Sequence, residues 1–127
     1  MPYLALIKPS LIQGSMSAIT DHYMHEMIQK TKPYTLVILH KTAKLNDVGA
    51  KEIVWEHGRR NFELRSDGKL NIVCPVRDDS DISGVGVFST NLEDTRKIMD
   101  EDPAVKAGIL LYEMHPTSSF PGDSLPM

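Results

Sequence analysis

The order of strand-like and helix-like segments in the middle of this 127-residue chain is the feature that most constrains its fold. Tyr34–His40 is apolar at both alternating sets of positions, which is typical of a strand that is covered on both faces. A long helix is expected next, capped by Asn46 or Asp47 and running to about Leu64, with a glycine shortly beyond its end. A buried strand followed closely by a long helix indicates a fold that mixes the two.

The second half of this region predicts three more strands and one more helix. The strands are expected at Leu70–Val76, Val85–Ser89 and Ile109–His115. The helix is expected to open with a capping box made by Thr90 and Glu93, and to end near Glu101 because Asp102 precedes Pro103. The order is therefore β-α-β-β-α-β. This is the ferredoxin-like pattern of the α+β class, in which two helices cover one face of a four-stranded antiparallel sheet.

The other face of the expected sheet also carries Val, Leu and Ile side chains. A bare apolar face of this size is not tolerated on a soluble monomer. We therefore expect a homodimer in which a second copy covers this face, most simply across a two-fold axis.

The segments on either side of the domain differ from it in character. Residues 1–33 form an extension, residues 34–116 the ferredoxin-like domain, and residues 117–127, which hold two prolines and three serines, a flexible tail. The extension is expected to contain a helix at Ser17–Gln29, with Met16, Ile19, Tyr23 and Met27 on one face. The long helix of the domain has a second apolar face formed by Val48, Trp55 and Phe62. We expect the N-terminal helix to cover it.

Composition excludes several classes of protein. A length of 127 residues fits one domain, and a net charge of −3 argues against a general binder of nucleic-acid backbones. The single cysteine, Cys74, excludes an internal disulfide framework. No apolar run approaches the roughly 20 residues of a membrane span, and the first residues lack the basic region of a signal peptide. We expect a cytoplasmic protein with no membrane partner and no nucleic-acid partner.

Two residues of this domain are candidates for chemistry. His57 shares a helix face with apolar residues, so it is either an inert core histidine or a general acid or base. Asp102 continues the inward stripe of the second helix at its C-terminal end, where a carboxylate needs a cation or a hydrogen-bond donor. Either His57 is that donor, or Asp102 caps the turn that follows and accepts from backbone amides near Ala104 and Val105.

The sequence contains no convincing motif for a metal or cofactor site. His22 and His25 are three residues apart, without a third ligand, and are better explained as a solvated helix face. The Asp79–Gly84 loop imitates the start of a calcium loop but has Thr90 in place of the closing glutamate. Haem binding through His40 or His115 has no supporting motif. No metal and no cofactor are therefore predicted.

Short motifs around the candidate pair resemble those of a known family. His57…Leu64…Gly68-Lys69-Leu70…Cys74-Pro75 resembles the H…L…G-x-L…G-P signature of the YCII-related (YciI-like) family, and Asp102-Pro103…Gly108 resembles its DP…G signature. The resemblance covers about residues 34–116. It implies a dimeric α+β barrel with an active site made by a histidine and an aspartate, which map to His57 and Asp102. The family is related to muconolactone isomerase-like enzymes and includes a dehydrochlorinase that acts on a chlorinated hydroxyquinol, while most members have no assigned activity.

This chain departs from the family pattern at two places. Cys74 replaces the glycine before proline, which adds a side chain where the backbone can approach a ligand. The N-terminal extension also lies outside the family core. Taken alone, Cys74 is expected to be a small buried side chain rather than a nucleophile.

The implied function is proton transfer by a His-Asp pair on a small carbonyl or hydroxylated aromatic substrate, by a cofactor-free enzyme of the lyase, isomerase or dehydrohalogenase type. Arg59 and Arg60 flank His57 and could hold an anionic substrate, or they are surface arginines that confer solubility. Of the two, Arg60 is taken as the substrate-binding candidate. Tyr112 is a second candidate contact, or a buried core tyrosine. The alternative function is a non-catalytic dimeric domain that binds a small ligand.

Overall fold

The computed structural model describes residues 18–127, and these divide into two units. The larger unit is Lys32–Ser119, and the smaller unit combines the residues up to Thr31 with Phe120–Met127. Met16 and Ser17, which the sequence places at the start of the first helix, lie outside the described residues. None of the helices among residues 18–127 is both long and apolar enough to cross a lipid bilayer.

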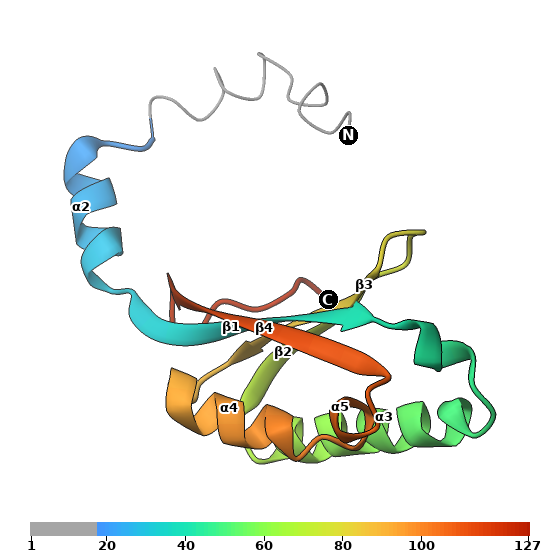
Figure 1. Ribbon diagram of the computed structural model, residues 1–127. Helices are drawn as coiled ribbons and strands as arrows, with labels where there is room; N and C mark the ends of the chain where they lie inside the picture. Colours follow the sequence, from blue (N-terminus) through green and yellow to red (C-terminus); the bar gives the residue numbers. More distant parts are fainter. Residues whose placement is uncertain (1–17) are drawn as a thin grey trace. The chain divides into compact units, whose positions relative to one another are not determined.

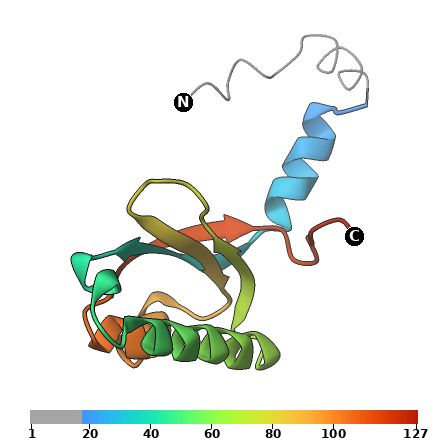
Figure 2. The same cartoon turned by 90° about the vertical axis from the view of Figure 1, so that its right-hand side faces the viewer.

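The larger unit has the predicted ferredoxin-like α+β architecture. Its elements are β1 (Lys32–Lys41), the 3-10 segment η2 (Ala43–Asn46), α3 (Ala50–Ser66), β2 (Leu70–Pro75), β3 (Ile82–Phe88), α4 (Leu92–Asp100), α5 (Pro103–Lys106) and β4 (Leu110–Ser119). The strands form one antiparallel sheet in the order β2-β3-β1-β4. Helices α3, α4 and α5 lie together on one face of this sheet (Figure 1), and α3 runs along it (Figure 2).

The long helix α3 begins later than the sequence predicts. Asn46 and Asp47 were expected to cap it, but they end the 3-10 segment, and α3 starts at Ala50 after Gly49, whose φ of 86° is left-handed. Thr42 explains the difference, because its hydroxyl donates to the Gly108 carbonyl at 2.6 Å and accepts from the amide of residue 44. This link to the start of β4 fixes the turn, and the helix forms only after glycine reverses the chain.

The cap of α4 also differs from the prediction by one residue. The side chain of Asn91, not Thr90, accepts the hydrogen bond from the Asp94 amide at 2.8 Å. The Thr90 hydroxyl instead pairs with the hydroxyl of buried Thr95 at 2.7 Å. The expected end of the helix near Glu101 is confirmed, since α4 stops at Asp100.

The structure adds one short helix that was not predicted and extends the last predicted strand, Ile109–His115. The short helix α5 starts with Pro103 at its first position, where a missing amide hydrogen costs nothing. Strand β4 runs on to Ser119, because its partner β1 pairs with it from Lys32 onward. Pro116 is tolerated in this pairing because β4 is an edge strand. The chain therefore leaves the sheet three residues later than the expected tail at 117.

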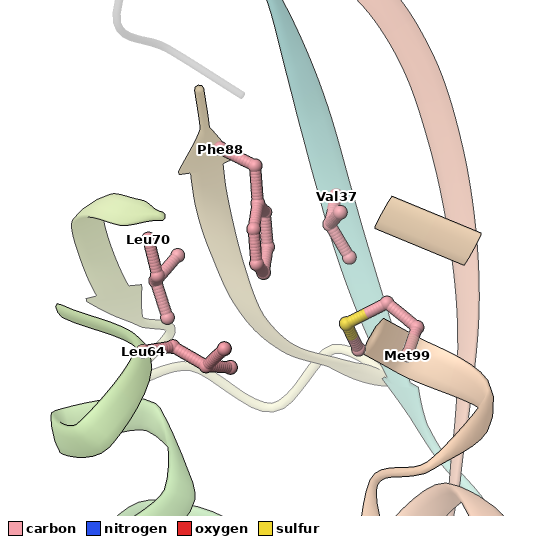
Figure 3. Packing of buried hydrophobic residues seen from close by; sticks show 5 residues of the cluster. All are labelled: Val37, Leu64, Leu70, Phe88 and Met99. Carbon is pink, nitrogen blue, oxygen red and sulfur yellow. The ribbon is translucent and has the colours of Figure 1, made fainter. Parts of the chain in front are cut away.

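The core lies between the sheet and its helices. One cluster of buried side chains joins β1, α3, β2, β3 and α4 and consists of Val37, Leu64, Leu70, Phe88 and Met99, which point toward one another (Figure 3). A second cluster joins α3, α5 and β4 and consists of Ala50, Ala104, Ile109 and Leu110. Burial of each large side chain contributes roughly 1.5–3 kcal/mol. The second cluster fixes α5 against α3, which brings the two candidate residues into range.

The opposite face of the sheet is uncovered within this unit. Thr35 and Val37 of β1 are buried on the helix side, so the alternate residues Leu36 and Ile38 lie on the open side. They pair with Val87 and Val85 of β3, and in β4 the open face continues to Leu111, which is 59% exposed. The structure therefore has the apolar sheet face from which the sequence predicts a homodimer.

The first helix, α2 (Asp21–Gln29), is shorter than the predicted Ser17–Gln29. Its cap is Thr20, whose side chain accepts from the Tyr23 amide at 3.1 Å, and none of its residues is buried. On α3, Trp55 and Phe62 are 71% and 72% exposed. The packing of the N-terminal helix on these two side chains stays a prediction.

Candidate active site

His57 and Asp102 meet in the helix layer. His57 lies in the middle of α3, and Asp102 lies between α4 and α5. The His57 Nδ1 atom is 2.7 Å from the Asp102 Oδ1 atom, which is a short hydrogen bond. Asp102 is buried, and the His57 side chain is 12% exposed. The two residues therefore form a pair that lies largely out of water.

Asp102 also caps helix α5. Its second oxygen, Oδ2, accepts from the backbone amides of Ala104 at 3.0 Å and Val105 at 3.1 Å. The sequence left two roles open for this residue, a partner for His57 or a cap for the following turn. The structure realises both, because each carboxylate oxygen serves one of them.

These contacts fix the charge of Asp102. Burial alone would raise the pKa of its carboxyl, but the hydrogen bonds from His57 and the two backbone amides outweigh burial and hold the pKa below its usual 3.8. Asp102 is therefore a carboxylate at neutral pH. A carboxylate only accepts hydrogen bonds, so the hydrogen in the pair is on Nδ1 of His57, and the lone pair of the neutral ring is on Nε2.

Asn61 contacts the other nitrogen of the ring. Its side-chain nitrogen Nδ2 is 3.3 Å from His57 Nε2. Asn61 was not assigned to the site from the sequence. The spacing of four residues was the available signal, since it places two side chains one above the other on a helix.

The two adjacent arginines differ in position. Arg60 Nη1 is buried, lies 3.8 Å from Asp102 Oδ1 and has no hydrogen-bond partner among the described residues. Arg59 is 61% exposed and pairs with Glu56 at 3.2 Å. The structure thus brings Arg60 to the His57–Asp102 pair and leaves Arg59 in solvent.

Tyr112 is partly buried against the core and uses its hydroxyl elsewhere. The hydroxyl donates to Asp100 Oδ1 at 2.6 Å, two residues before Asp102. Burial, followed by the bond to Asp100, raises the pKa of Tyr112. The structure does not join this hydroxyl to His57, so its role as a substrate contact stays a prediction.

His40 and His115, the other two histidines of the larger unit, lie on the face of the sheet opposite to the pair. His40 and His115 each place Nε2 2.6 Å from one oxygen of Glu113, on the open face of the sheet. The hydrogen bond from the His40 ring to the Glu113 carboxylate raises the pKa of His40. His22 is 3.4 Å from Glu26 on α2. Among residues 18–127, no group of three His, Cys, Asp or Glu side chains is arranged to hold a metal ion.

Two features lie outside the pair. Cys74 is exposed, so the expectation of a buried side chain was wrong. It pairs with Val85 and therefore lies on the open face of the sheet, not on the face that packs against the helices.

A hollow of about 440 Å³ lies on the outer side of α3, and His57 is not among its lining residues. Its lining is mostly apolar and consists of Leu45, Lys51, Val54, Trp55, Gly58, Arg59 and Phe62.

Comparison with known proteins finds a similar solved structure but no matching family. No protein-family model matches the chain, and no curated protein matches it. Among solved structures, it is similar to the 5-chloro-2-hydroxyhydroquinone dehydrochlorinase (TftG) from Burkholderia phenoliruptrix AC1100, in its complex with 2,5-dihydroxybenzoquinone. The two are 14% identical, the alignment covers 65% of this chain and 90% of that chain, and the TM-score is 0.46. The resemblance to the YCII-related family therefore stays a prediction from the motifs.

The lowered pKa of Asp102 predicts a pH-dependent contribution to stability. The group binds its proton more weakly when folded than when unfolded. Its contribution is therefore present above about pH 4 and lost as the pH falls through the folded-state pKa. In urea unfolding at neutral pH, Asp102→Asn should lower the free energy of unfolding by about 1–3 kcal/mol relative to the unsubstituted protein.

That difference should shrink below about pH 4. The control Asp79→Asn, in the exposed loop between β2 and β3, should stay within about 0.5 kcal/mol at every pH. A difference for Asp102→Asn that is constant from neutral to acid pH would contradict the assignment of an ionised, stabilising carboxylate.

Proposed function

We propose that this protein is a YciI-like enzyme that moves a proton on a small carbonyl or hydroxylated aromatic substrate, without a cofactor, in a lyase, isomerase or dehydrohalogenase reaction. The 2.7 Å bond between His57 Nδ1 and Asp102 Oδ1 is the observation that carries the proposal. A buried carboxylate on one ring nitrogen orients the imidazole and leaves the other nitrogen as the base.

The proposed chemistry uses the two residues in turn. His57 Nε2 takes a proton from a carbon or hydroxyl of the substrate, and the imidazolium that forms is stabilised by the negative charge of Asp102. The electron pair left on the substrate then delocalises onto a carbonyl or ring oxygen. In an isomerase the same proton returns at another carbon, whereas in a dehydrohalogenase a halide ion leaves.

The positive charge of Arg60 favours a substrate that is an anion or develops negative charge on an oxygen. Its buried Nη1 is 3.8 Å from Asp102 Oδ1 and makes no hydrogen bond with any described residue, so a donor without a partner lies beside the carboxylate of the pair. A guanidinium in this place stabilises negative charge that develops on a substrate oxygen. Tyr112 would join the substrate only if its hydroxyl left Asp100.

We also propose that the protein is a homodimer. The open sheet face carries Leu36, Ile38, Val85, Val87 and Leu111, and nothing within its own unit covers it. Apolar side chains from adjacent strands form a continuous patch, and a second copy of the same patch buries it on both protomers.

A second candidate function is a dimeric domain that binds a small ligand and performs no reaction. The hollow of about 440 Å³ beside Trp55 and Phe62 favours it, because this volume and apolar lining suit a small ligand and the hollow lies apart from His57. Trp55 is the single tryptophan, so its fluorescence reports ligand binding there.

Substitution of His57 tests the enzyme proposal. Small hydroxylated aromatics and β-keto acids are screened for turnover by absorbance, and each active compound is retested with His57→Gln. Loss of the base should lower kcat by about 100-fold or more, while the melting temperature changes little. The control His25→Gln, on the exposed surface of α2, should retain full activity. Equal activity in His57→Gln would contradict the role of His57.

Compounds that alter Trp55 fluorescence but are never converted would support the second candidate function, a domain that binds a small ligand without a reaction.

The arginine pair tests the substrate contact. Arg60→Ala should raise KM for an anionic substrate by about 10- to 100-fold, the loss expected for one hydrogen bond to a charged group. Arg59→Ala removes the same charge one residue earlier on the exposed side and should leave KM unchanged. Equal effects of the two substitutions would mean that only the overall charge matters.

Leu111→Asp tests the dimer. A carboxylate on the open face cannot be buried against a second copy, so size-exclusion chromatography with light scattering should show half the wild-type mass. The control Leu92→Asp, at the start of α4 on the helix side, should stay dimeric. A wild-type protein of monomer mass would exclude the dimer.

A further inference from the structure

One polar contact of His57, between its Nε2 atom and the side chain of Asn61, has no role in the proposed proton transfer. His57 Nε2, the atom that would take the proton, already has a neighbour, since Asn61 Nδ2 is 3.3 Å away. Both residues belong to α3, one turn apart, and both are partly buried. Their contact is therefore set by the helix and does not depend on a mobile loop.

The direction of this hydrogen bond follows from the other end of the ring. In the Asp102 carboxylate, Oδ2 accepts hydrogen bonds from two backbone amides, and Oδ1 accepts one from Nδ1–H of His57. Nε2 of the neutral ring therefore has a lone pair and no hydrogen. An amide nitrogen can only donate. Asn61 therefore donates to the lone pair of the neutral imidazole.

An asparagine side chain can serve both protonation states of the ring. With its nitrogen toward Nε2 it donates to the neutral form, and after a half-turn of the amide its oxygen accepts from the Nε2–H of the imidazolium. The ring is then held at both nitrogens in either state, by Asp102 at Nδ1 and by Asn61 at Nε2.

We propose that Asn61 is the positioning residue of this site: it donates to Nε2 of the neutral, Nδ1–H form of the His57 ring before the substrate binds, gives up this lone pair to the substrate for the proton transfer, and accepts from Nε2–H afterwards. The inference rests on the proposed function for its catalytic meaning. The charged groups at the site are Asp102, from the link between α4 and α5, which contacts Nδ1 of the ring, and Arg60 of α3, which lies 3.8 Å from Asp102 Oδ1. A neutral amide therefore holds Nε2 without adding a charge that would favour either protonation state.

Nitrogen-15 NMR of the His57 side chain tests the contact directly. The wild-type protein should show one tautomer, with hydrogen on Nδ1. Asn61→Asp places a carboxylate at Nε2, so the titration midpoint of His57 should move up by at least about one pH unit relative to wild type. Asn71→Asp adds the same charge on β2, where the Asn71 amide bonds the Gly68 carbonyl, and should leave the midpoint unchanged.

Kinetics test the positioning role. Asn61→Ala should lower kcat by about tenfold or more with little change in KM, because the ring is held at one end only. Asn61→Gln, which keeps an amide, should restore part of the loss. In Asn61→Asp the acid limb of the kcat/KM profile should move to higher pH together with the NMR midpoint. If His57 were not the base, the limb would stay in place while the NMR midpoint moved.

Three results would overturn the proposal: an Nε2–H tautomer in the wild type, equal midpoints in Asn61→Asp and Asn71→Asp, or an unchanged kcat in Asn61→Ala. Failure of the proposed function looks different. In that case the tautomer and the midpoint shift are as expected, but His57→Gln retains wild-type turnover. The contact would then stand as a structural bond only.

Discussion

The Asp102 carboxylate is the interaction on which the rest of the site depends. Taking a charge out of water is unfavourable unless hydrogen bonds replace the lost solvation. Here Oδ2 receives two backbone amides and Oδ1 receives the His57 ring. The position of His57, the start of α5 and the lone pair on Nε2 of the neutral imidazole all follow from how these two oxygens are used.

The sheet separates two sets of polar groups. On the helix side lie His57, Asp102 and Arg60, enclosed by the buried clusters that fix α3 and α5. On the open side lie His40 and His115, which share the carboxylate of Glu113 among apolar residues. Because side chains alternate along each strand, residues one position apart in β1 belong to different environments. The proposed chemistry and the proposed dimer therefore use opposite faces of the same sheet.

The order of elements was predictable because it depends on local patterns of apolar residues, on caps and on prolines. The pairing of His57 with Asp102 was implied by the family resemblance and by the inward stripe of α4. Other features depend on contacts far apart in sequence. Thr42 binds the Gly108 carbonyl and delays α3. Arg59 and Arg60 are neighbours in sequence but about 100° apart around the helix, so only the packing of α3 on α5 decides which reaches Asp102. Asn61 needed no such distant contact, since its spacing of four residues from His57 was a local signal that the prediction did not use.

Helix α5 has only four residues, fewer than a helix needs to persist by itself in water. It is held by the cap from Asp102 and by the burial of Ala104. If this turn unwinds briefly, the carboxylate loses its amides and His57 loses the fixed partner of Nδ1 in the same event. Such an unwound turn would dismantle the site as one local unit, because the amides of α5 and the partner of the histidine depend on the same carboxylate.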